Sequence, residues 1–295
     1  MTSRIVSVSA ALYDGYPFPD VLESLAACGV THVEPAFIVG YTEAFDEGAF
    51  AVEPARQYAR WLEESGLGCF AFSSHIDLGR EDAVEVFRRR MDFAAALGAR
   101  VINTNAAART RREQFFRNLP ALIRHAEVLD MRIGLENPGD GSDNLINTAE
   151  DGIVLLREIG SDRVGLNYDA ANTASHRPEG RLGGVNPAED AVRATPCCVH
   201  VHIKDLKITP EGYFFTPIGE GQIGCGRILR ALAQSRINLS IEMPLRLSRD
   251  VRAQPVRRPT PVPRGELESA LRQSLDYLHV QLENALSQNF VQEAS

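Results

Sequence analysis

Four side chains that can bind a metal ion occur at similar positions in four apolar segments. They are separated by 33, 33 and 40 residues and are Glu136, Asp169, His202 and Glu242. Three carboxylates and one imidazole form an oxygen-rich ligand set, which suits Mn²⁺, Mg²⁺, Co²⁺ or Zn²⁺ better than soft metals. A single acid at the end of a strand is more often a structural carboxylate. Four in matching positions instead predict a metal site, provided that the fold brings the segments together.

The segment around His202 has the alternation typical of a β-strand. In Cys198–Asp205, the residues Val199, Val201 and Ile203 alternate with a polar set. Side chains alternate between the faces of a strand, so this polar set shares one face. Its members are His200, His202 and Lys204.

Two members of this polar face have open roles. We interpret His200 as a support or core residue rather than a ligand. Lys204 is a candidate catalytic residue, which could neutralise an enolate or a substrate carboxylate. An ion pair with Asp205 is the alternative for Lys204. Only Lys204 and Lys207 are lysines among 31 basic residues, a weak indication that an amine is needed at this position.

The positions of the four ligands require a fold that gathers strand ends. Strand patterns alternate with helix patterns along the chain, which predicts βα units around a parallel sheet. Eight such units in this length predict a single (β/α)₈ barrel spanning residues 1–295. A doubly wound sheet is the alternative, but no GxGxxG motif follows the first strand. The predicted strands are 4–10, 31–36, 68–76, 100–105, 132–137, 164–169, 198–205 and 238–243.

The predicted loops are strongly asymmetric. Links from helix to strand are short, whereas those from strand to helix are long and share the C-terminal end of the barrel, where barrel active sites lie. The long links are 37–52, 137–148, 170–186, 206–226 and 245–265. The last contains six Arg and four Pro, and we expect either an extended arm on a neighbouring subunit or a phosphate site. Residues 219–226 are Gly-rich, a weak signal for phosphate.

Composition narrows the classes of partner. The 295 residues carry a net charge of −8, which argues against nucleic acid as the main partner. No apolar run is long enough for a membrane span, and the N-terminus lacks a signal-peptide pattern. Five cysteines without CxxC spacing suggest reduced thiols. We therefore expect a cytoplasmic protein that acts on a small molecule without membrane contact, and we leave open a homo-oligomer.

Four motifs together resemble the xylose-isomerase-like TIM-barrel superfamily, the group of sugar isomerases and epimerases that includes endonuclease-IV-type enzymes. They are Gly134–Asn137 (GLEN), Gly165–Asn172 (GLNYDAAN), His200–Asp205 (HVHIKD) and Ser240–Met243 (SIEM). The resemblance implies one divalent metal ion, most readily Mn²⁺, held by Glu136, Asp169, His202 and Glu242. It also implies proton abstraction beside the carbonyl of a keto-sugar through a metal-bound enediolate. Glu136 and Glu242 would then move the proton.

The chain departs from the ketose 3-epimerases at Asn172, where these enzymes often carry a histidine. Asn can bind a sugar hydroxyl but cannot transfer a proton, so the reaction stays open. Isomerase or epimerase is the first hypothesis. A lyase of the same site is the alternative, either a dehydratase or an enzyme that eliminates from a 3-keto-glycoside. A non-catalytic sugar-binding barrel comes third.

Further candidates lie at the ends of other strands. His75 is a candidate catalytic residue or substrate contact, with a structural histidine as the alternative. Contacts to sugar hydroxyls are assigned to Asn172, Asn105, Glu34 and Asn137, with a structural role as the alternative for Asn105 and Glu34. The endonuclease branch needs several more His ligands for three metals, and this chain has only seven His. We therefore expect one metal ion.

Overall fold

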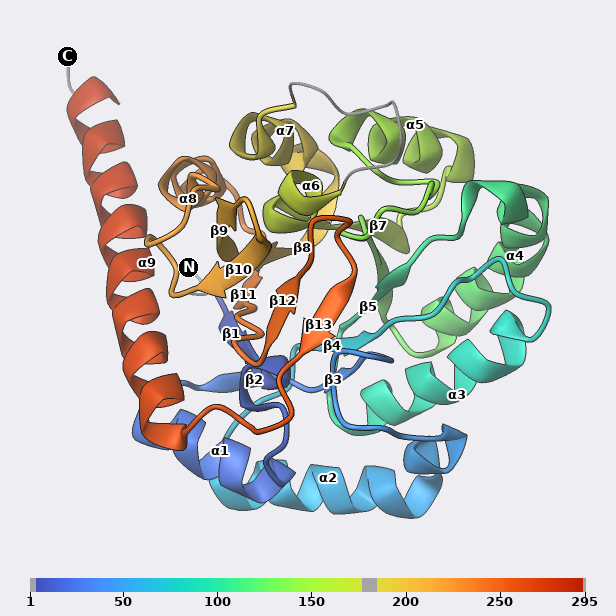
Figure 1. The fold of residues 1–295 in the computed structure, drawn as a ribbon. Helices are drawn as coiled ribbons and strands as arrows, with labels where there is room; N and C mark the ends of the chain where they lie inside the picture. Colours follow the sequence, from blue (N-terminus) through green and yellow to red (C-terminus); the bar gives the residue numbers. More distant parts are fainter. Residues whose placement is uncertain (1–3, 177–184, 294–295) are drawn as a thin grey trace.

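The computed structural model describes residues 4–176 and 185–293, with side chains up to residue 285. Nine parallel strands form a nearly closed barrel in the order β2-β1-β11-β8-β7-β6-β5-β4-β3, with helices outside (Figure 1). The predicted (β/α)₈ barrel is therefore confirmed. The barrel strands are β1 (Val6–Ser9), β2 (His32–Glu34), β3 (Ala36–Phe37), β4 (Ala71–Ser74), β5 (Val101–Asn105), β6 (Arg132–Glu136), β7 (Val164–Asp169), β8 (Cys198–Ile203) and β11 (Leu239–Ile241).

β2 and β3 are two parts of the predicted second strand. The break falls at Pro35, which has no N–H to donate to a strand ladder. The neighbouring segment still pairs across the break, because Ser73 N donates to Pro35 O at 2.9 Å and Val33 N donates to Gly68 O at 2.9 Å. These bonds join the segment of β2 and Pro35 to β4 and the residues before it, which nearly closes the barrel.

Residue types that favour helix ends stand at the ends of α2 and α5. Thr148 caps α5 together with Asp151 in a reciprocal capping box. Gly66 ends α2 and Gly160 ends α5, both in the left-handed conformation that glycine adopts without strain. The helices are α1 (Phe18–Ala27), α2 (Val52–Ser65), α3 (Ala83–Ala96), α4 (Arg112–Val128), α5 (Ala149–Ile159), α6 (Ala170–Ser175), α7 (Pro187–Ala194), α8 (Cys225–Ala233) and α9 (Arg264–Glu293).

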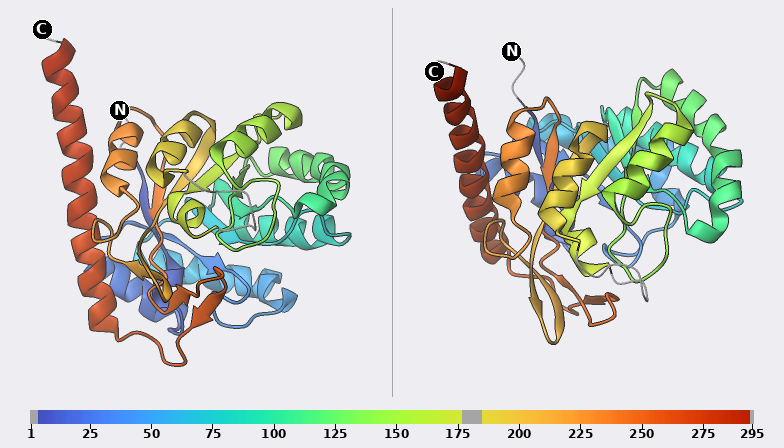
Figure 2. Two further views of the ribbon diagram at one scale, coloured as in Figure 1. Left: turned by 45° about the horizontal axis from the view of Figure 1, so that its top comes forward. Right: turned by 90° about the horizontal axis from the view of Figure 1, so that it is seen from above.

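Two of the long loops contain strands that the sequence analysis did not predict. They form a separate antiparallel sheet in the order β13-β12-β10-β9, and Figure 2 shows both hairpins together at one end of the barrel. The predicted strand 198–205 ends at Ile203, and the chain continues directly into this sheet. The strands are β9 (Asp205–Thr209), β10 (Gly212–Thr216), β12 (Leu247–Arg249) and β13 (Pro255–Arg257). Residues 177–184 of the predicted loop 170–186 lie outside the described residues.

The Arg-rich segment 245–265 packs on its own barrel. Arg257 donates from Nε and Nη2 to the two oxygens of Asp14 at 2.7 and 2.9 Å, and Arg246 Nη1 donates to Glu43 Oε1 at 3.0 Å. Contact of this segment with a neighbouring subunit stays a prediction. These two Arg already have carboxylate partners, which argues against the phosphate site.

The Gly-rich residues 219–226 surround a carboxylate of the protein itself. Asp205 Oδ2 accepts from Gly219 N at 2.9 Å and from Gly221 N at 3.0 Å, and its Oδ1 accepts from Ile223 N at 3.2 Å. The backbone N–H groups that a phosphate would need are thus already bonded. Asp205 fixes this loop, and the weak prediction of phosphate there was wrong.

Candidate active site

The four predicted ligands converge at the C-terminal end of the barrel. One ligand atom from each of the four lies within 4.8 Å of the others, and all four residues are buried. Glu136 and Asp169 end β6 and β7, His202 lies in β8, and Glu242 follows β11. The parallel register explains the convergence, because Asp169 is paired with His202 and Ser240 is also paired with His202.

Glu34 orients the imidazole of His202 through the Nε2 atom. His202 Nε2 lies 3.0 Å from Glu34 Oε1, whereas Nδ1 lies 3.2 Å from Glu136 Oε2 and 3.3 Å from Glu242 Oε2. A carboxylate that accepts Nε2–H fixes the tautomer and leaves Nδ1 as the ligand atom. Burial lowers the pKa of His202, but the charges of Glu34, Glu136 and Glu242 outweigh it and raise this pKa well above its usual value.

Glu34 does not contact the cavity above the four ligands, so its assignment as a sugar contact is corrected. Its side chain is fully buried, and Oε1 also accepts from Asn103 Nδ2 at 2.9 Å and from Ser73 Oγ. His200 lies beside it, with Nε2 3.4 Å from Glu34 Oε2 and 2.8 Å from Ser240 Oγ. These contacts fit the supporting role expected of His200, although Glu34, His200 and His202 also place one possible ligand atom each within 4.8 Å of one another.

Three side chains hold Glu136 in place. Asn167 Nδ2 donates to Oε2 at 2.8 Å, Asn172 Nδ2 donates to Oε1 at 2.9 Å, and His75 Nε2 lies 3.3 Å from Oε2. Burial raises the pKa of Glu136, but the nearby His202 and His75 outweigh it, and the net pKa is well below its usual value. Asn172 thus positions a carboxylate where the ketose epimerases often have a histidine.

Lys204 bridges the other two carboxylates. Its Nζ lies 2.6 Å from Asp169 Oδ2 and also pairs with Glu242 Oε2, so the alternative ion pair with Asp205 is not formed. Burial raises the pKa of Glu242, but Lys204 and His202 outweigh it and lower this pKa to about 2. Burial and the neighbouring Glu136 and Glu242 raise the pKa of Asp169 despite the opposing charge of Lys204.

The donor set fits a divalent cation. Asp169 Oδ2 and Glu242 Oε2 are enclosed and make no hydrogen bond of normal geometry, although both lie near the Lys204 amine. Three buried carboxylates around one ammonium leave an excess of negative charge that a divalent ion can balance. Glu136, Asp169, Glu242 and Nδ1 of His202 are the atoms that could hold it.

Asn137 supports this arrangement from outside the cavity. Its Nδ2 donates to Asp169 O at 2.8 Å and its Oδ1 accepts from Asp169 N at 2.9 Å. Because both ends of the amide are occupied by the backbone of a ligand residue, the assignment of Asn137 as a sugar contact is corrected. It fixes the end of β7 instead.

A cavity of about 370 Å³ is lined by two of the four residues, Glu136 and Glu242, and its size suits a small molecule. Four other residues from the sequence analysis line it, namely His75, Asn105, Asn172 and Lys204. Six charged or aromatic lining residues were missed, namely Tyr41, Asp77, Arg80, Arg90, Asp140 and Arg249. Tyr41, Asp140 and Arg249 come from the long loops that the sequence analysis placed at this end of the barrel. Asp77 and Arg80 come from the shorter link between β4 and α3, and Arg90 lies in α3 itself.

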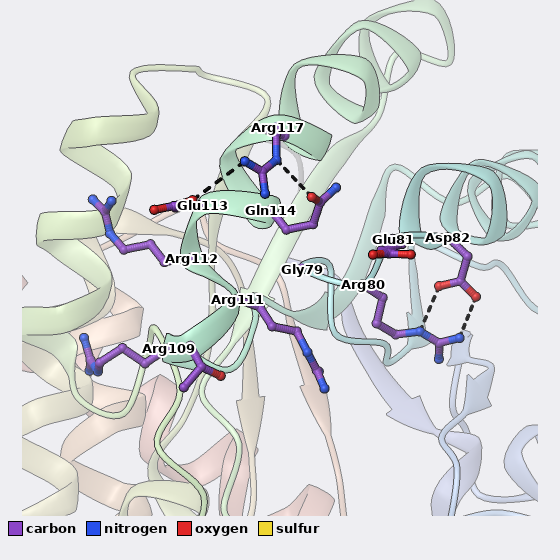
Figure 3. A pocket seen from close by; sticks show the side chains of 11 residues that line it. Gly79, Arg80, Glu81, Asp82, Arg109, Arg111, Arg112, Glu113, Gln114 and Arg117 are labelled. Atoms are coloured by element: carbon purple, nitrogen blue, oxygen red, sulfur yellow. Dashed lines mark hydrogen bonds and ion pairs between the residues drawn. The ribbon is translucent and has the colours of Figure 1, made fainter.

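A larger surface cavity of about 870 Å³ adjoins the first and shares Arg80 with it. Figure 3 shows its lining, in which Arg80 pairs with both oxygens of Asp82 and Arg117 pairs with Glu113. None of its lining residues belongs to the buried cluster of carboxylates and histidines. We therefore place the chemistry in the smaller cavity.

The sequence matches the xylose isomerase-like TIM barrel family over residues 22–278. The chain belongs to this family. No curated protein matches the sequence well enough to count as a relative.

Every helix in the described residues is too short or too polar to cross a membrane. The five cysteines, as expected, are free thiols.

Solved structures with this fold include several sugar epimerases. An L-ribulose 3-epimerase aligns with a TM-score of 0.70 at 17% identity, over 98% of each chain. A D-psicose 3-epimerase from Clostridium cellulolyticum H10, solved with D-tagatose, aligns at 0.70 and 14% identity over 95% of this chain and 99% of that one. The probable 3-DHS dehydratase AsbF from Bacillus anthracis aligns at 0.62 and 15% identity, over 81% and 92%.

Proposed function

We propose that this protein is a divalent-metal-dependent isomerase or epimerase of a keto-sugar. One observation carries the proposal. Three carboxylates and one imidazole place a ligand atom each within 4.8 Å of the others, under a cavity of a size that suits a small sugar. The epimerases among the similar structures support the same reaction class, although identities of 13–19% show the fold alone.

Glu136 and Glu242 are the proposed groups that remove and return a proton. Both line the cavity, and both are deprotonated at neutral pH because histidine or lysine charges lower their pKa values. A carboxylate with a lowered pKa is a weak base. A bound divalent ion would supply the missing driving force by acidifying the C–H beside the substrate carbonyl.

His75 and Lys204 are the proposed assisting groups. His75 lies 3.3 Å from Glu136 and lines the cavity, so it can exchange a proton with a substrate oxygen beside that carboxylate. Lys204 lines the cavity as well and carries a positive charge that can stabilise an enolate. Asn172 and Asn105 remain as proposed contacts for hydroxyl groups.

A lyase of the same site is the second candidate. Asn172 favours it, because the amide holds Glu136 and cannot deliver a proton to the opposite face of the substrate. The dehydratase among the similar structures has the same fold. Both reactions start with the same proton removal, and they differ in whether a leaving group then departs.

Proton exchange tests the proposal directly. Purified protein with Mn²⁺ is incubated in D₂O with ketoses and 3-keto-glycosides, and deuterium at the carbon beside the carbonyl is measured by NMR. We expect incorporation that disappears in Glu136→Gln and persists in the control Glu113→Gln, whose side chain is 88% exposed. Exchange with a new stereoisomer identifies an epimerase, and loss of a substituent identifies a lyase. No exchange with any substrate of either class would refute the proposal and leave a sugar-binding barrel.

A further inference from the structure

Most cations that line the active-site cavity have a carboxylate partner. Arg80 donates to both oxygens of Asp82, at 2.9 and 2.6 Å. Arg90 pairs with Glu47, and Lys204 pairs with two of the proposed metal ligands. These charges are balanced within the protein and need no counter-charge from a ligand.

Arg249 is different. It ends β12, lines the cavity and is only 3% exposed. Its Nη1 donates to Ala253 O at 3.1 Å, its Nη2 makes a long contact of 3.4 Å to Asn172 Oδ1, and its guanidinium lies 5.3 Å from the ring centre of Tyr41. Nε is enclosed and has no partner. Among the residues that the structure describes, the hydrogen-bond partners of this guanidinium are a backbone carbonyl and an amide oxygen, and neither is a carboxylate.

Burying an unpaired charge is costly, so a protein keeps one mainly where a ligand supplies the counter-charge. The divalent ion of the proposed function and Lys204 together would balance the three ligand carboxylates. The fourth buried carboxylate of the cluster, Glu34, contacts His200 and His202 and forms no ion pair with Arg249. The guanidinium of Arg249 therefore lacks a counter-charge at contact distance. Asp140 lines the same cavity, but it is half-buried, and its Oδ1 accepts from Ser142 N at 3.0 Å and from Ser142 Oγ. It forms no ion pair with Arg249.

The position of Arg249 connects it to the reaction centre. Asn172 bonds to Glu136 through Nδ2 and contacts Arg249 through Oδ1, so one amide separates the guanidinium from the proposed base. Gly139 also lines the cavity, and a side chain there would begin 2.9 Å from Arg249 Nη2. It would lie closer still to Asn172 Oδ1 and Ser175 Oγ, at 2.6 and 2.7 Å, so glycine here lets Arg249 and Asn172 pack against the backbone.

We propose that the substrate is a polyhydroxy acid or keto-sugar acid whose carboxylate pairs with Arg249. This inference rests on the proposed function and names the substrate class of the same site. A singly charged carboxylate matches the one cation that lacks a partner among the described lining residues. A phosphate carries more negative charge and needs a second free cation, whereas Arg80 and Arg90 already have partners.

Matched ligands test this inference without turnover. The affinities of the Mn²⁺-loaded protein for aldonates and for the alditols of the same configuration (gluconate with glucitol, ribonate with ribitol, galactonate with galactitol) are measured by calorimetry. We expect at least one aldonate to bind tenfold or more tightly than its alditol. Arg249→Gln should reduce this ratio to near one, and Arg249→Lys should keep part of it. Arg252→Gln, on the exposed turn of the same hairpin, should leave the ratio unchanged.

Equal binding of every aldonate and alditol by the native protein would overturn the inference, even if Arg249→Gln does not fold. The inference would also be overturned if a folded Arg249→Gln protein still preferred aldonates over alditols. Tighter binding of glucitol 6-phosphate than of gluconate would overturn it as well. The proposed function is judged separately by proton exchange. If the protein exchanges protons but binds aldonates no better than alditols, only this inference is refuted. If it prefers aldonates but exchanges no protons, only the proposed function is refuted.

Discussion

The replacement of Lys204 by methionine tests whether this residue and a metal ion compensate the same buried carboxylates. Lys204 is 4% exposed and pairs with two buried carboxylates. Removing one partner of a buried ion pair costs about 3–5 kcal/mol, because the remaining charges are left uncompensated. We expect this loss in the free energy of unfolding of Lys204→Met without metal.

A bound divalent ion compensates the same two carboxylates, so the loss should be smaller with Mn²⁺. If the metal recovers about 2 kcal/mol of it, linkage requires that Mn²⁺ binds the variant roughly thirtyfold more tightly than the native protein. Urea unfolding with EDTA and with excess Mn²⁺ gives the two stabilities. Calorimetric titration with Mn²⁺ gives the affinity independently.

Lys207→Met is the matched control, because Lys207 is the other lysine of the chain and its side chain is 51% exposed. It should leave both stability and Mn²⁺ affinity nearly unchanged. An equal loss of stability in Lys204→Met with and without Mn²⁺, or weaker Mn²⁺ binding, would refute the reasoning. Either result would mean that the amine and the metal do not share the charges of Asp169 and Glu242.

Three further outcomes follow from single contacts. Glu34→Gln should weaken Mn²⁺ binding by about 10- to 100-fold in a titration, because Glu34 orients the imidazole of His202. Asp205→Ala should lower the free energy of unfolding in urea by about 2–4 kcal/mol, since its carboxylate accepts four backbone N–H groups. Burial raises the pKa of Tyr13 to about 12, above about 10 in the unfolded chain. The contribution of protonated Tyr13 to the free energy of unfolding is thus complete below pH 10 and is lost between pH 10 and 12. Native protein should therefore lose about 2 kcal/mol more than Tyr13→Phe between pH 9 and 11.5 in urea unfolding.

The barrel and the convergence of the four proposed ligands follow from local patterns in the sequence. Asp169 and His202 end up near each other because parallel strands of one barrel bring their C-terminal ends together, which strand spacing predicts. Their direct pairing also needs a register shift between Leu166 and Asn167, which strand spacing does not predict. The strand that contains Pro35 was predicted as one element, and the missing N–H divides it in two. The sequence thus predicts where a residue lies along a strand. Which hydrogen bonds that strand makes depends on the strands beside it.

The roles of Glu34 and Arg249 could not be predicted in the same way. Glu34 also ends a strand, but whether its side chain faces the cavity or His202 depends on packing between strands distant in sequence. Arg249 reaches the cavity because β12 pairs with β10, a contact between two loops about 35 residues apart in the sequence. Local patterns contain no signal for such a pairing, so the loop was predicted and its buried guanidinium was not.

The central claim is that Glu136, Asp169, His202 and Glu242 together hold one divalent ion. Metal analysis by mass spectrometry of protein equilibrated with Mn²⁺ and then desalted tests it most directly. We predict about one ion per chain in the native protein and in Glu113→Gln, and a large loss in both Glu136→Gln and His202→Ala. Native protein that retains no ion, or folded variants that retain as much as the native protein, would contradict the claim.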